Sequence, residues 1–498
     1  MKRVLVANRG EIALRIIRAC HEEGLEAVAV YSVADRKSLH VQAADFAVPL
    51  GPPPPGESYL RGDLLIEAAR QTGADAIHPG YGFLSERASF AQAVTDAGLI
   101  FVGPSAGAIH AMGNKTEARR RMQAAGVPIV PGTTVAAADP ADLAAIASDI
   151  GYPVLIKAAA GGGGRGMRIV TQPNDLEAAF AMASSEAAKA FGDGSVYIEK
   201  YIERPRHIEI QVLADHERTI HLGERECSIQ RRHQKVVEEA PSPAVSAELR
   251  ARMGAAAVAA AKAVGYRSAG TCEFLLGSDG SFYFLEMNTR IQVEHPVTEM
   301  VYGVDLVREQ LRIARGLPMS IAAAGVLAPR GWALECRITS EDPANGFLPS
   351  TGTVTFLRPP AGPGVRWDGG IGAGDEITLF YDSLLGKLIV WGNDREQAIA
   401  RMLRALGELL LVGVFSNLPF HCRLMRDPEF REGRFDTQFL ERRTDLLQAP
   451  MSDDHKLVAA VAAALAEAEV RMLRRPPVAA ESDARSVWAR VGRREALG

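Results

Sequence analysis

The chain of 498 residues lacks the features that mark several common classes of protein. It has no run of ~18 or more apolar residues, the length that a membrane-spanning helix needs, and its first residues enter a strand-like run at once. Its net charge of −4 offers no general excess of basic side chains to a nucleic acid. The sequence therefore predicts no membrane span, no cleaved leader and no nucleic-acid partner.

Cysteine is also sparse, and its spacing argues against two further kinds of site. The cysteines form no C-x-x-C pair, which disfavours both a disulfide framework and a cysteine-ligated zinc site. They are Cys20, Cys227, Cys272, Cys336 and Cys422. Scattered thiols fit a reducing compartment, so we expect a cytoplasmic protein.

The remaining composition is that of an ordinary globular protein, with 47% hydrophobic and 23% charged residues. The chain is too long for one core and predicts roughly three domains. Strand-like and helix-like segments alternate over residues 1–113, which predicts a parallel sheet with helices on both faces. A nicotinamide-binding domain is disfavoured, because the first turn, NRGE, has one glycine where dinucleotide binding needs G-x-G-x-x-G.

Three further segments follow. Residues 114–334 combine a small glycine-rich unit with long strands such as HIEIQVLAD and SFYFLEMN, which we expect to be antiparallel. Residues 335–445 add the predicted strands WALECRIT, GTVTFLR and LLGKLIVWG and an amphipathic helix. Residues 446–498 begin with a predicted helix and end in a polar linker. The apolar face of that helix comprises Leu457, Val461, Leu465, Ala468 and Met472.

The stretch AAAGGGGRGMRIV contains G-x-G-x-x-G at Gly161, Gly163 and Gly166, between two predicted strands. No helix opens there and no G-K-[ST] follows, so it is neither a Rossmann turn nor a P-loop. Such a loop lets backbone N–H groups close over phosphates. Lys157 precedes it in an apolar strand, where a lysine needs an anionic partner such as a nucleotide phosphate. A flexible hairpin with a snorkelling lysine is the alternative.

The strand HIEIQVLAD carries a row of polar side chains. His207, Glu209 and Gln211 alternate along it and share one face, shortly after Glu199 and Lys200. A half-exposed strand with a satisfied histidine is one interpretation. The other is a nucleotide site, with Glu199 and Lys200 at the end of a mobile segment and His207 beside the nucleotide.

The stretch CSIQRRHQKVVEEAP places Arg231, Arg232, His233 and Lys235 within one short segment. A solvated basic loop is a common outcome for such a sequence. Because the chain has little net charge elsewhere, a local cluster also suits phosphate or bicarbonate better than a duplex.

Two segments carry candidate metal ligands. TCEFLL places Glu273 among apolar residues, and FLEMN ends with Glu286 and Asn288. Carboxylate and amide oxygens are the ligands that Mg²⁺ takes alongside nucleotide phosphates. Unrelated surface carboxylates are the alternative, but an unpaired carboxylate in an apolar strand is costly.

The stretch FLEMNTRIQVEHPVTEM has polar residues at alternate positions. They are Glu286, Asn288, Arg290, Gln292 and Glu294. In one extended strand all of them would point to one side, and Leu285, Met287, Ile291 and Val293 to the other. Alternation alone is typical of the wet face of a surface strand. Beside a phosphate loop, a basic cluster and an apolar-strand carboxylate, it predicts the wall of an active site.

Several long motifs resemble those of biotin carboxylase, an ATP-grasp enzyme, in the family's order over residues 2–440. They are ANRGEIALRIIRAC, IHPGYGFLSE, MGNK, GGGGRGM, ERECSIQRRHQKVVEEAP, EMNTRIQVEHPVTE, ECRI, FLPSTG and YDSLLGKL. The resemblance implies an α/β fold in four parts. These are an N-terminal doubly wound parallel-sheet domain (1–113), an ATP-grasp domain (114–334) with a mobile α+β lid (130–203), a β-rich C-terminal domain (335–445) and a tail (446–498).

The resemblance also implies roles for residues at matching positions. ATP contacts are implied for Lys115, Lys157, Glu199, Lys200, His207, Gln230, His233 and Leu275, and a phosphate loop for Gly161, Gly162, Gly163, Gly164 and Gly166. A pair of Mg²⁺ or Mn²⁺ ions is implied at Glu273, Glu286 and Asn288. Bicarbonate is implied at Lys235, Arg290, Gln292, Val293 and Glu294, and biotin at Arg337 and Tyr81. Asn114 stands where relatives often have aspartate, and we expect little consequence from it.

The implied reaction is ATP-dependent carboxylation of biotin through carboxyphosphate. Arg290 and Lys235 would orient bicarbonate, and Glu294 would take its proton as general base. Attack on the γ-phosphate would follow beside the metal ions, within a closed lid that excludes water. Arg337 would stabilise the ureido anion of biotin.

The chain contains no A-M-K-M-type biotin attachment sequence. The resemblance therefore implies a separate biotin carboxyl carrier protein, a carboxyltransferase subunit that chooses the final acceptor, and a homodimer. The tail helix is either packed on its own chain or docked on a partner.

Two other functions are open. Another ATP-grasp ligase that forms an acyl phosphate leaves RIQVEHPVTE unexplained. A non-catalytic nucleotide-binding scaffold predicts loss of Lys235, Arg290, Glu294 or Arg337, and all four are present.

Overall fold

The computed structural model describes residues 1–133, 139–159, 167–321, 328–447 and 453–473. The chain divides into two units, residues 1–447 and 448–498. Within the described ranges, no helix combines the length and the apolar character needed to cross a membrane. Short 3-10 helices occupy Val33–Asp35, Pro55–Glu57, Pro173–Asp175 and Pro343–Asn345.

The predicted parallel N-terminal sheet is confirmed, with strand order β3-β2-β1-β4-β5. Its strands are β1 (Arg3–Val6), β2 (Glu26–Ser32), β3 (Phe46–Gly51), β4 (Ala76–His78) and β5 (Ile100–Phe101). Its helices are α1 (Gly10–Glu22), α2 (Leu39–Ala43), α3 (Gly62–Thr72), α4 (Ala88–Asp96) and α5 (Ala106–Gly113). Val4 packs with Ile16 of α1, whereas Leu5 packs with Leu65 of α3. Alternate residues of β1 thus contact helices on opposite faces.

A second sheet has eight strands in the order β13-β12-β9-β10-β11-β14-β21-β19 and is antiparallel throughout. Its strands are β9 (Arg206–Ala214), β10 (Thr219–Arg231), β11 (Gln234–Ala240), β12 (Ser268–Leu276), β13 (Phe282–Asn288), β14 (Trp332–Thr339), β19 (Val365–Gly369) and β21 (Leu384–Gly392). Helices α9 (Ala247–Ala263), α10 (His295–Tyr302), α11 (Leu306–Ala314) and α12 (Arg395–Glu408) pack against it. Because β11 pairs with β14, the sheet is continuous between segments far apart in sequence.

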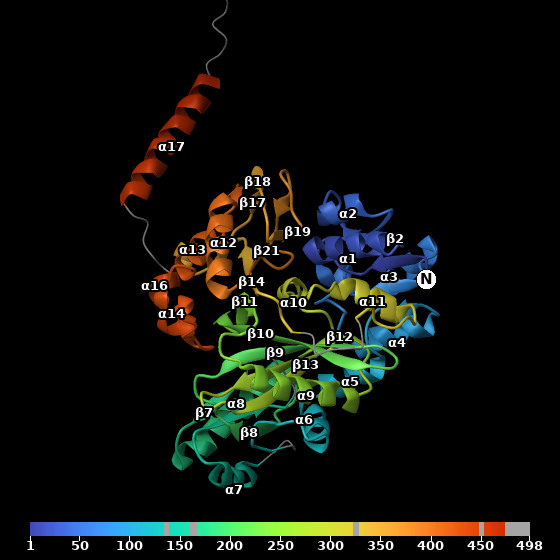
Figure 1. The fold of residues 1–498 in the computed structure, drawn as a ribbon, viewed down its shortest axis with the longest axis vertical. Coiled ribbons are helices and arrows are strands. Elements are labelled where there is room, and N and C mark those ends of the chain that lie inside the picture. The colour runs from blue at the N-terminus through green and yellow to red at the C-terminus, as the bar shows by residue number, and fades with distance from the viewer. Residues whose placement is uncertain (134–138, 160–166, 322–327, 448–452, 474–498) are drawn as a thin grey trace, which may run out of the picture. The chain divides into compact units, whose positions relative to one another are not determined.

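Residues 139–200 form a small α+β layer with its own core. Its elements are α7 (Pro140–Ile150), β6 (Val154–Ala158), β7 (Arg168–Val170), α8 (Leu176–Phe191) and β8 (Val196–Lys200), with strand order β7-β6-β8. Leu143, Ile156, Phe180 and Ile198 meet in that core. Figure 1 shows this layer at the lower end of the first unit, beyond β9 and β13. Helix α6 (Lys115–Ala124) precedes it.

The C-terminal part of the first unit adds short elements. They are β15 (Glu341–Asp342), β16 (Leu348–Pro349), β17 (Gly352–Thr353), β18 (Phe356–Arg358), β20 (Glu376–Ile377), β22 (Leu410–Val412), α13 (Leu418–Leu424), α14 (Pro428–Arg431), α15 (Phe439–Arg442) and α16 (Thr444–Leu447). The prediction of one strand over GTVTFLR is wrong. β17 pairs with β20 and β18 with β22, so the two halves of this segment belong to different small sheets.

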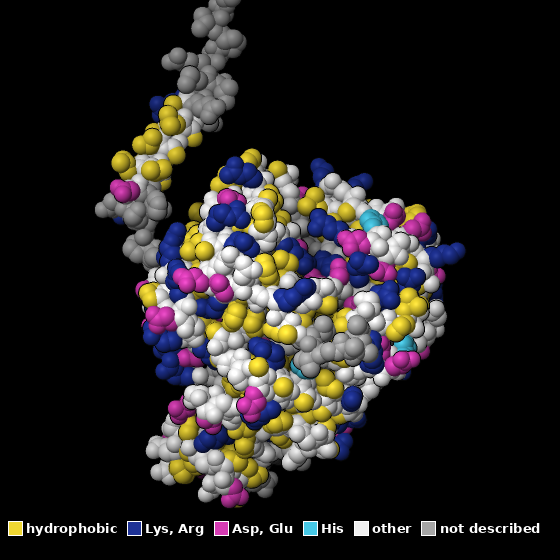
Figure 2. Space-filling model, in the orientation of Figure 1, with side chains coloured by type: hydrophobic (Ala, Val, Ile, Leu, Met, Phe, Trp, Pro, Cys, Tyr) yellow, Lys and Arg dark blue, Asp and Glu magenta, His cyan; other side chains and the backbone are white. Residues whose placement is uncertain are grey.

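The described part of the second unit is helix α17 (Asp453–Leu473), where a helix was predicted. Leu457, Val461 and Leu465 of the predicted apolar face are each more than half exposed, at 65%, 52% and 66%. Figure 2 shows apolar side chains along this helix. The side chain of Met472 lies outside the described residues.

Candidate active site

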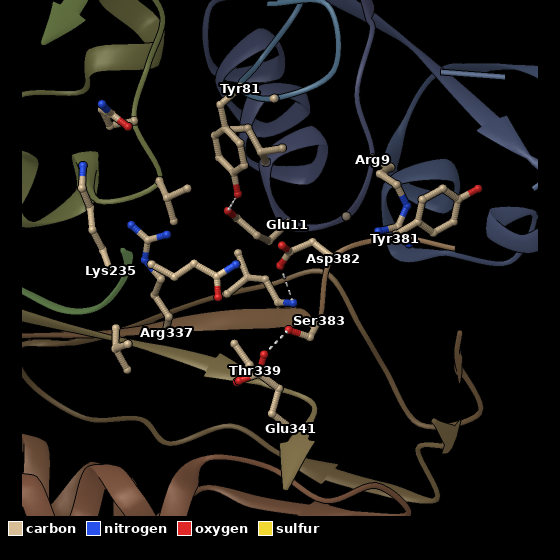
Figure 3. Close-up of a pocket in the computed structure, with 18 of the residues that line it drawn as sticks. Arg9, Glu11, Tyr81, Lys235, Arg337, Thr339, Glu341, Tyr381, Asp382 and Ser383 are labelled. Carbon is tan, nitrogen blue, oxygen red and sulfur yellow. Dashed lines mark hydrogen bonds between the residues drawn. The ribbon is translucent and has the colours of Figure 1, made fainter. Parts of the chain in front are cut away.

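A cavity of about 640 Å³ opens among the N-terminal end of α1, the hairpin of β10 and β11, and β14. Its lining includes Glu11, Tyr81, Lys235, Arg290 and Arg337. In Figure 3, Tyr81 points toward Glu11, and Lys235 and Arg337 extend into the pocket from the neighbouring wall. Side chains that the sequence assigned to bicarbonate and to biotin thus line one cavity.

Lys235, at the start of β11, lies among three carboxylates. Its Nζ donates to Glu273 Oε1 and to Glu294 Oε1, at 2.9 Å each, and also to Glu209. Burial acts to lower the pKa of Lys235, but these carboxylates raise it well above the ordinary value. Lys235 is therefore a fixed cation inside the protein.

Glu294 is the N-cap residue of α10 and is completely buried. Besides Lys235, it binds Arg337, whose NH2 group donates to Oε2 at 2.8 Å. Burial and the nearby Glu209 act to raise the pKa of Glu294, but Lys235 and Arg337 outweigh them and hold it below the ordinary value. An ionised Glu294 can accept a proton from a substrate bound in the cavity.

A second buried arginine binds a carboxylate of this charged cluster. Arg225 on β10 is completely buried and donates to Glu209 Oε2 at 3.0 Å and to Gln211 Oε1 at 2.6 Å. Glu209 thus joins Arg225 to Lys235, and although burial acts to raise its pKa, Lys235 holds it below the ordinary value. The sequence placed Glu209 on the correct strand face but gave Arg225 no role. The signal that could have identified Arg225 was its charge within a strand-like run.

The prediction of one extended strand over Glu286 to Glu294 is wrong beyond Asn288. β13 ends at Asn288, and the chain bends before α10 begins at His295. The polar side chains still converge, because Arg290 NH1 donates to Gln292 Oε1 at 2.9 Å and Gln292 Nε2 to Glu273 Oε1 at 3.3 Å. A turn, and not strand alternation, brings them together.

The apolar residues that alternate with these polar residues differ in burial. Ile291 is completely buried in the core, as predicted. Val293, which the resemblance places at the bicarbonate site, is half-buried and lines the cavity. Its backbone carbonyl accepts from the buried Lys387 Nζ at 2.8 Å.

Glu273 and Glu286 are directly opposite each other on β12 and β13. Asn288 lies two residues after Glu286 on β13, and its Nδ2 donates to Glu273 Oε1 at 2.7 Å. Like charges at directly opposite positions of a ladder destabilise it. A divalent cation relieves that repulsion, and two carboxylates with an amide form a donor set that suits Mg²⁺. These residues therefore fit the predicted metal site.

Three residues predicted at the nucleotide are neighbours on the central sheet. His207 Nδ1 lies 3.1 Å from Gln230 Nε2, and Leu275 is directly opposite His207 on β12. The Nε2 atom of His207 is 3.1 Å from Glu273 Oε2. Burial acts to lower the pKa of His207, but Glu273 outweighs it and the pKa rises to about 9.

The lid residues have partners within the protein. Lys157 pairs with Glu199, which also binds Arg119 NH1 at 3.2 Å. Lys200 Nζ donates to the backbone carbonyl of Gly151 at 2.9 Å. The anionic partner that the sequence demanded for Lys157 is thus a protein carboxylate, so burial of this lysine does not by itself indicate a phosphate.

Two further predictions fall outside what the structure describes. The loop of Gly161, Gly162, Gly163, Gly164 and Gly166 lies outside the described residues, as does the side chain of Lys115 at the start of α6.

Three basic residues of QRRHQK line the cavity, namely Arg231, His233 and Lys235, although their surroundings differ. Arg232 and His233 make the exposed turn between β10 and β11, with φ of 50° and 64°. Arg231 stacks on the ring of Phe347, at 4.2 Å from its centroid. Lys235 is drawn into the carboxylate cluster, because alternate residues after the turn point to opposite faces.

Three carboxylates that bind cavity-lining side chains had no assigned role in the sequence. Glu11 accepts a hydrogen bond from Tyr81, Glu86 Oε2 accepts one from Arg290 Nε at 2.9 Å, and Glu238 Oε1 accepts one from Arg337 Nε at 2.6 Å. All three lie within the long motifs quoted above. Their partners come from distant segments, which the sequence alone does not pair.

Three family models match consecutive parts of this chain. They are the biotin carboxylase N-terminal domain over residues 1–109, the carbamoyl-phosphate synthase L chain ATP-binding domain over 114–322, and the biotin carboxylase C-terminal domain over 335–442. This chain belongs to the biotin carboxylase family. The predicted ATP-grasp α/β fold is confirmed, and the match decides against the other ATP-grasp ligases.

Individual relatives cover nearly the whole first unit. Biotin carboxylase of Nostoc sp. is 54% identical over 440 residues, which cover 88% of this chain and 98% of that protein. Biotin carboxylase 1 of Bacillus subtilis is 53% identical over 443 residues, which cover 89% of this chain and 98% of that protein.

One similar solved structure carries nucleotide and bicarbonate together. It is the biotin carboxylase domain dimer of Hydrogenobacter thermophilus 2-oxoglutarate carboxylase in complex with MgADP, ADP and bicarbonate. It superimposes with a TM-score of 0.84 at 47% identity and covers 90% of this chain and 99% of that one. As a member of this family, the present chain uses ATP, Mg²⁺ and bicarbonate to carboxylate biotin. This is the first half-reaction of biotin-dependent carboxylases. Proteins of this family work with a carrier protein and a carboxyltransferase.

Proposed function

We propose that this biotin carboxylase is a homodimeric component that carboxylates biotin on a separate carrier protein. The residues of its cavity have separate roles in the reaction. The observation that carries the assignment is the chain of ion pairs from Lys235 through Glu294 to Arg337. It places one buried proton acceptor between two cations at a cavity wall.

Bicarbonate lies beside Glu294 in this proposal, held by Arg290 and Lys235, with Gln292 and Val293 lining its site. Glu294 takes the hydroxyl proton of bicarbonate, and a bicarbonate oxygen attacks the γ-phosphorus of ATP. The bond from that phosphorus to ADP breaks, which forms carboxyphosphate. General-base catalysis of this kind contributes typically 10²–10⁴-fold, about 3–5 kcal/mol.

ATP occupies the side of the central sheet that faces the lid. Lys115, Lys157, Glu199, Lys200, His207, Gln230, His233 and Leu275 contact it, and Gly161, Gly162, Gly163, Gly164 and Gly166 cover its phosphates. Glu273, Glu286 and Asn288 hold the metal ions, which when bound offset negative charge on the phosphates. Closure of the lid excludes water from carboxyphosphate, which water would otherwise hydrolyse.

Biotin enters between Arg337 and Tyr81. Carboxyphosphate breaks down to CO₂ and phosphate, phosphate removes the N1′ proton of biotin, and N1′ then bonds to the carbon of CO₂. Negative charge develops on the ureido oxygen during this step, and Arg337 stabilises it. Glu238 and Glu294 orient the guanidinium for that task.

The final carboxyl acceptor is chosen by the carboxyltransferase. Solved relatives of nearly equal identity, 46% and 47%, belong to a pyruvate carboxylase and to a 2-oxoglutarate carboxylase, and both share this first half-reaction. The cavity residues therefore serve biotin in any such complex, and identification of the co-purifying transferase would name the acceptor.

The Arg337→Ala variant tests the division of labour. We expect it to impair carboxylation of free biotin far more than bicarbonate-dependent ATP cleavage, because Arg337 acts on the ureido oxygen. Both rates are measured at saturating Mg²⁺. Arg404→Ala, which removes an exposed arginine paired with Glu408 on α12, is the matched control. Equal loss of both activities in Arg337→Ala would contradict its assigned role, and ATP cleavage independent of bicarbonate would contradict the whole proposal.

A further inference from the structure

Two carboxylates behind Arg337 are buried face to face. Glu238 on β11 and Glu335 on β14 are directly opposite each other in the antiparallel ladder, and both side chains are completely buried. Glu238 Oε1 accepts from Arg337 Nε at 2.6 Å. Within the described part of the chain, Glu238 Oε2 and both oxygens of Glu335 have no hydrogen-bond donor.

Two anions in this arrangement would be strongly destabilised. Burial penalises each charge, and directly opposite like charges repel. Arg337 compensates Glu238 but donates no hydrogen bond to Glu335. One proton on Glu335 removes its charge and supplies the donor that Glu238 Oε2 lacks.

The other charged groups nearby are already engaged. Lys387 on β21 is completely buried, but its Nζ donates to the Val293 carbonyl and pairs with Glu11 Oε1 at 3.2 Å. The ionisable groups that interact with the pair from the surrounding elements include Arg337 and Cys336 of β14, Lys235 of β11, Lys387 of β21, Glu294 at the start of α10, and Tyr81.

We propose that Glu238 and Glu335 share one proton, carried by Glu335 and donated to Glu238 Oε2, and that the pair acts as a positioning device for Arg337. This inference rests on the proposed role of Arg337 at biotin. The pKa directions agree with the geometry. Burial raises the pKa of Glu335 well above the ordinary value, and it raises that of Glu238 to about 7 despite the opposing charge of Arg337.

The shared proton determines how far neighbouring carboxylates compensate the positive charge of Arg337. With the proton in place, Glu238 and Glu294 are its two anionic partners, and Glu294 becomes neutral once it has taken the proton of bicarbonate. The guanidinium charge is then balanced by Glu238 alone and attracts the ureido oxygen. Loss of the shared proton adds an anion beside Arg337 and weakens that attraction. The biotin step is thus supported at pH values where the pair is protonated and declines as rising pH removes the proton.

Infrared spectroscopy of the full-length protein tests the shared proton. We expect a carbonyl band of a buried carboxylic acid near neutral pH, which moves on ¹³C labelling of glutamate and disappears as rising pH removes the shared proton. Glu335→Gln keeps a donor toward Glu238 but has no such proton, so the band should be lost. Absence of a titrating band in the wild type, or its persistence in Glu335→Gln, would overturn the shared proton. The wild-type titration decides the question even where the variant fails to fold.

Kinetics test the positioning role. We expect Glu335→Gln to keep biotin carboxylation within several-fold of wild type near neutral pH and to lose the alkaline decline of kcat that the pair causes. Its bicarbonate-dependent ATP cleavage without biotin should keep the wild-type pH profile. An unchanged alkaline decline in kcat for biotin would overturn the positioning role. A titrating infrared band in the wild type, together with equal loss of biotin carboxylation and ATP cleavage in Arg337→Ala, would overturn the assignment of Arg337. It would leave the shared proton intact.

Discussion

At the scale of single residues, buried bases of this protein differ in charge because their partners differ. Lys235 is surrounded by carboxylates and is held as a cation. His421 on α13 is also completely buried, but its Nε2 donates to the backbone carbonyl of Arg337 at 2.8 Å and its Nδ1 has no partner among the described residues. Burial lowers the pKa of His421 to about 4, so it is neutral near pH 7.

His421 should make the fold sensitive to acid. The unfolded histidine binds a proton near its ordinary pKa of 6.5, whereas the folded one does so only near 4. Between those values the unfolded state holds more protons than the folded state. The free energy of unfolding therefore falls, as the pH decreases, by up to about 1.4 kcal/mol per pH unit. We expect His421→Gln, whose amide can donate the same hydrogen bond, to show a shallower fall. Urea unfolding at a series of pH values measures it.

The matched control is His216→Gln, which alters an exposed histidine after β9. Its fall in stability between pH 6.5 and 4 should follow the wild type. A slope for His421→Gln that equals those of wild type and control would show that the fold does not exclude the proton from this site.

At the scale of elements, a register shift in the β12–β13 hairpin separates the proposed metal ligands from the core. Glu273 is opposite Glu286, but the next pair is Phe274 with Phe284, so Leu285 is an extra residue on β13. Such a bulge lets Glu286 and Phe284 serve opposite faces although they are two positions apart. Phe274 and Phe284 pack edge to face, with centroids 6.0 Å apart, in a core beneath the sheet.

Phe274→Ala should destabilise this hairpin strongly. Phe274 is completely buried and contacts both Phe282 and Phe284, so its loss leaves a cavity worth about 3–5 kcal/mol. Urea unfolding measures the change, and a higher Mg²⁺ requirement for ATP cleavage should accompany it. Phe356→Ala removes a phenylalanine that is 48% exposed and should cost about 1 kcal/mol or less. Similar costs for both variants would show that the aromatic core does not hold the hairpin.

At the scale of the whole molecule, every described residue of the cavity belongs to the first unit, residues 1–447. The central sheet and the cores around it also lie there. A chain ending at Leu447 should therefore keep the midpoint of thermal unfolding and bicarbonate-dependent ATP cleavage. Differential scanning fluorimetry and the ATP assay measure these.

A chain ending at Leu409 is the contrasting control. It removes Phe420, Phe430 and Phe439, which are completely buried in the core beside β14 and β21. We expect this shorter chain to lose folding and activity together. Loss of activity in the chain ending at Leu447 would show that the tail contributes to the catalytic unit.

The sequence by itself determined the local elements and most of the chemistry. Apolar periodicity was enough for β1, α1 and β2, since each depends on neighbouring residues. Long motifs were enough to nominate Lys235 and Arg337, which line one cavity, and Glu294, which binds both of them.

Tertiary structure decided which charges meet. The bulge at Leu285, the bend after Asn288 and the pairing of Glu238 with Glu335 all depend on strand register between distant segments. Side-chain alternation predicts which residues share a face but not which strand lies opposite. A shift of one residue changes every partner, and burial makes that choice of partner decisive.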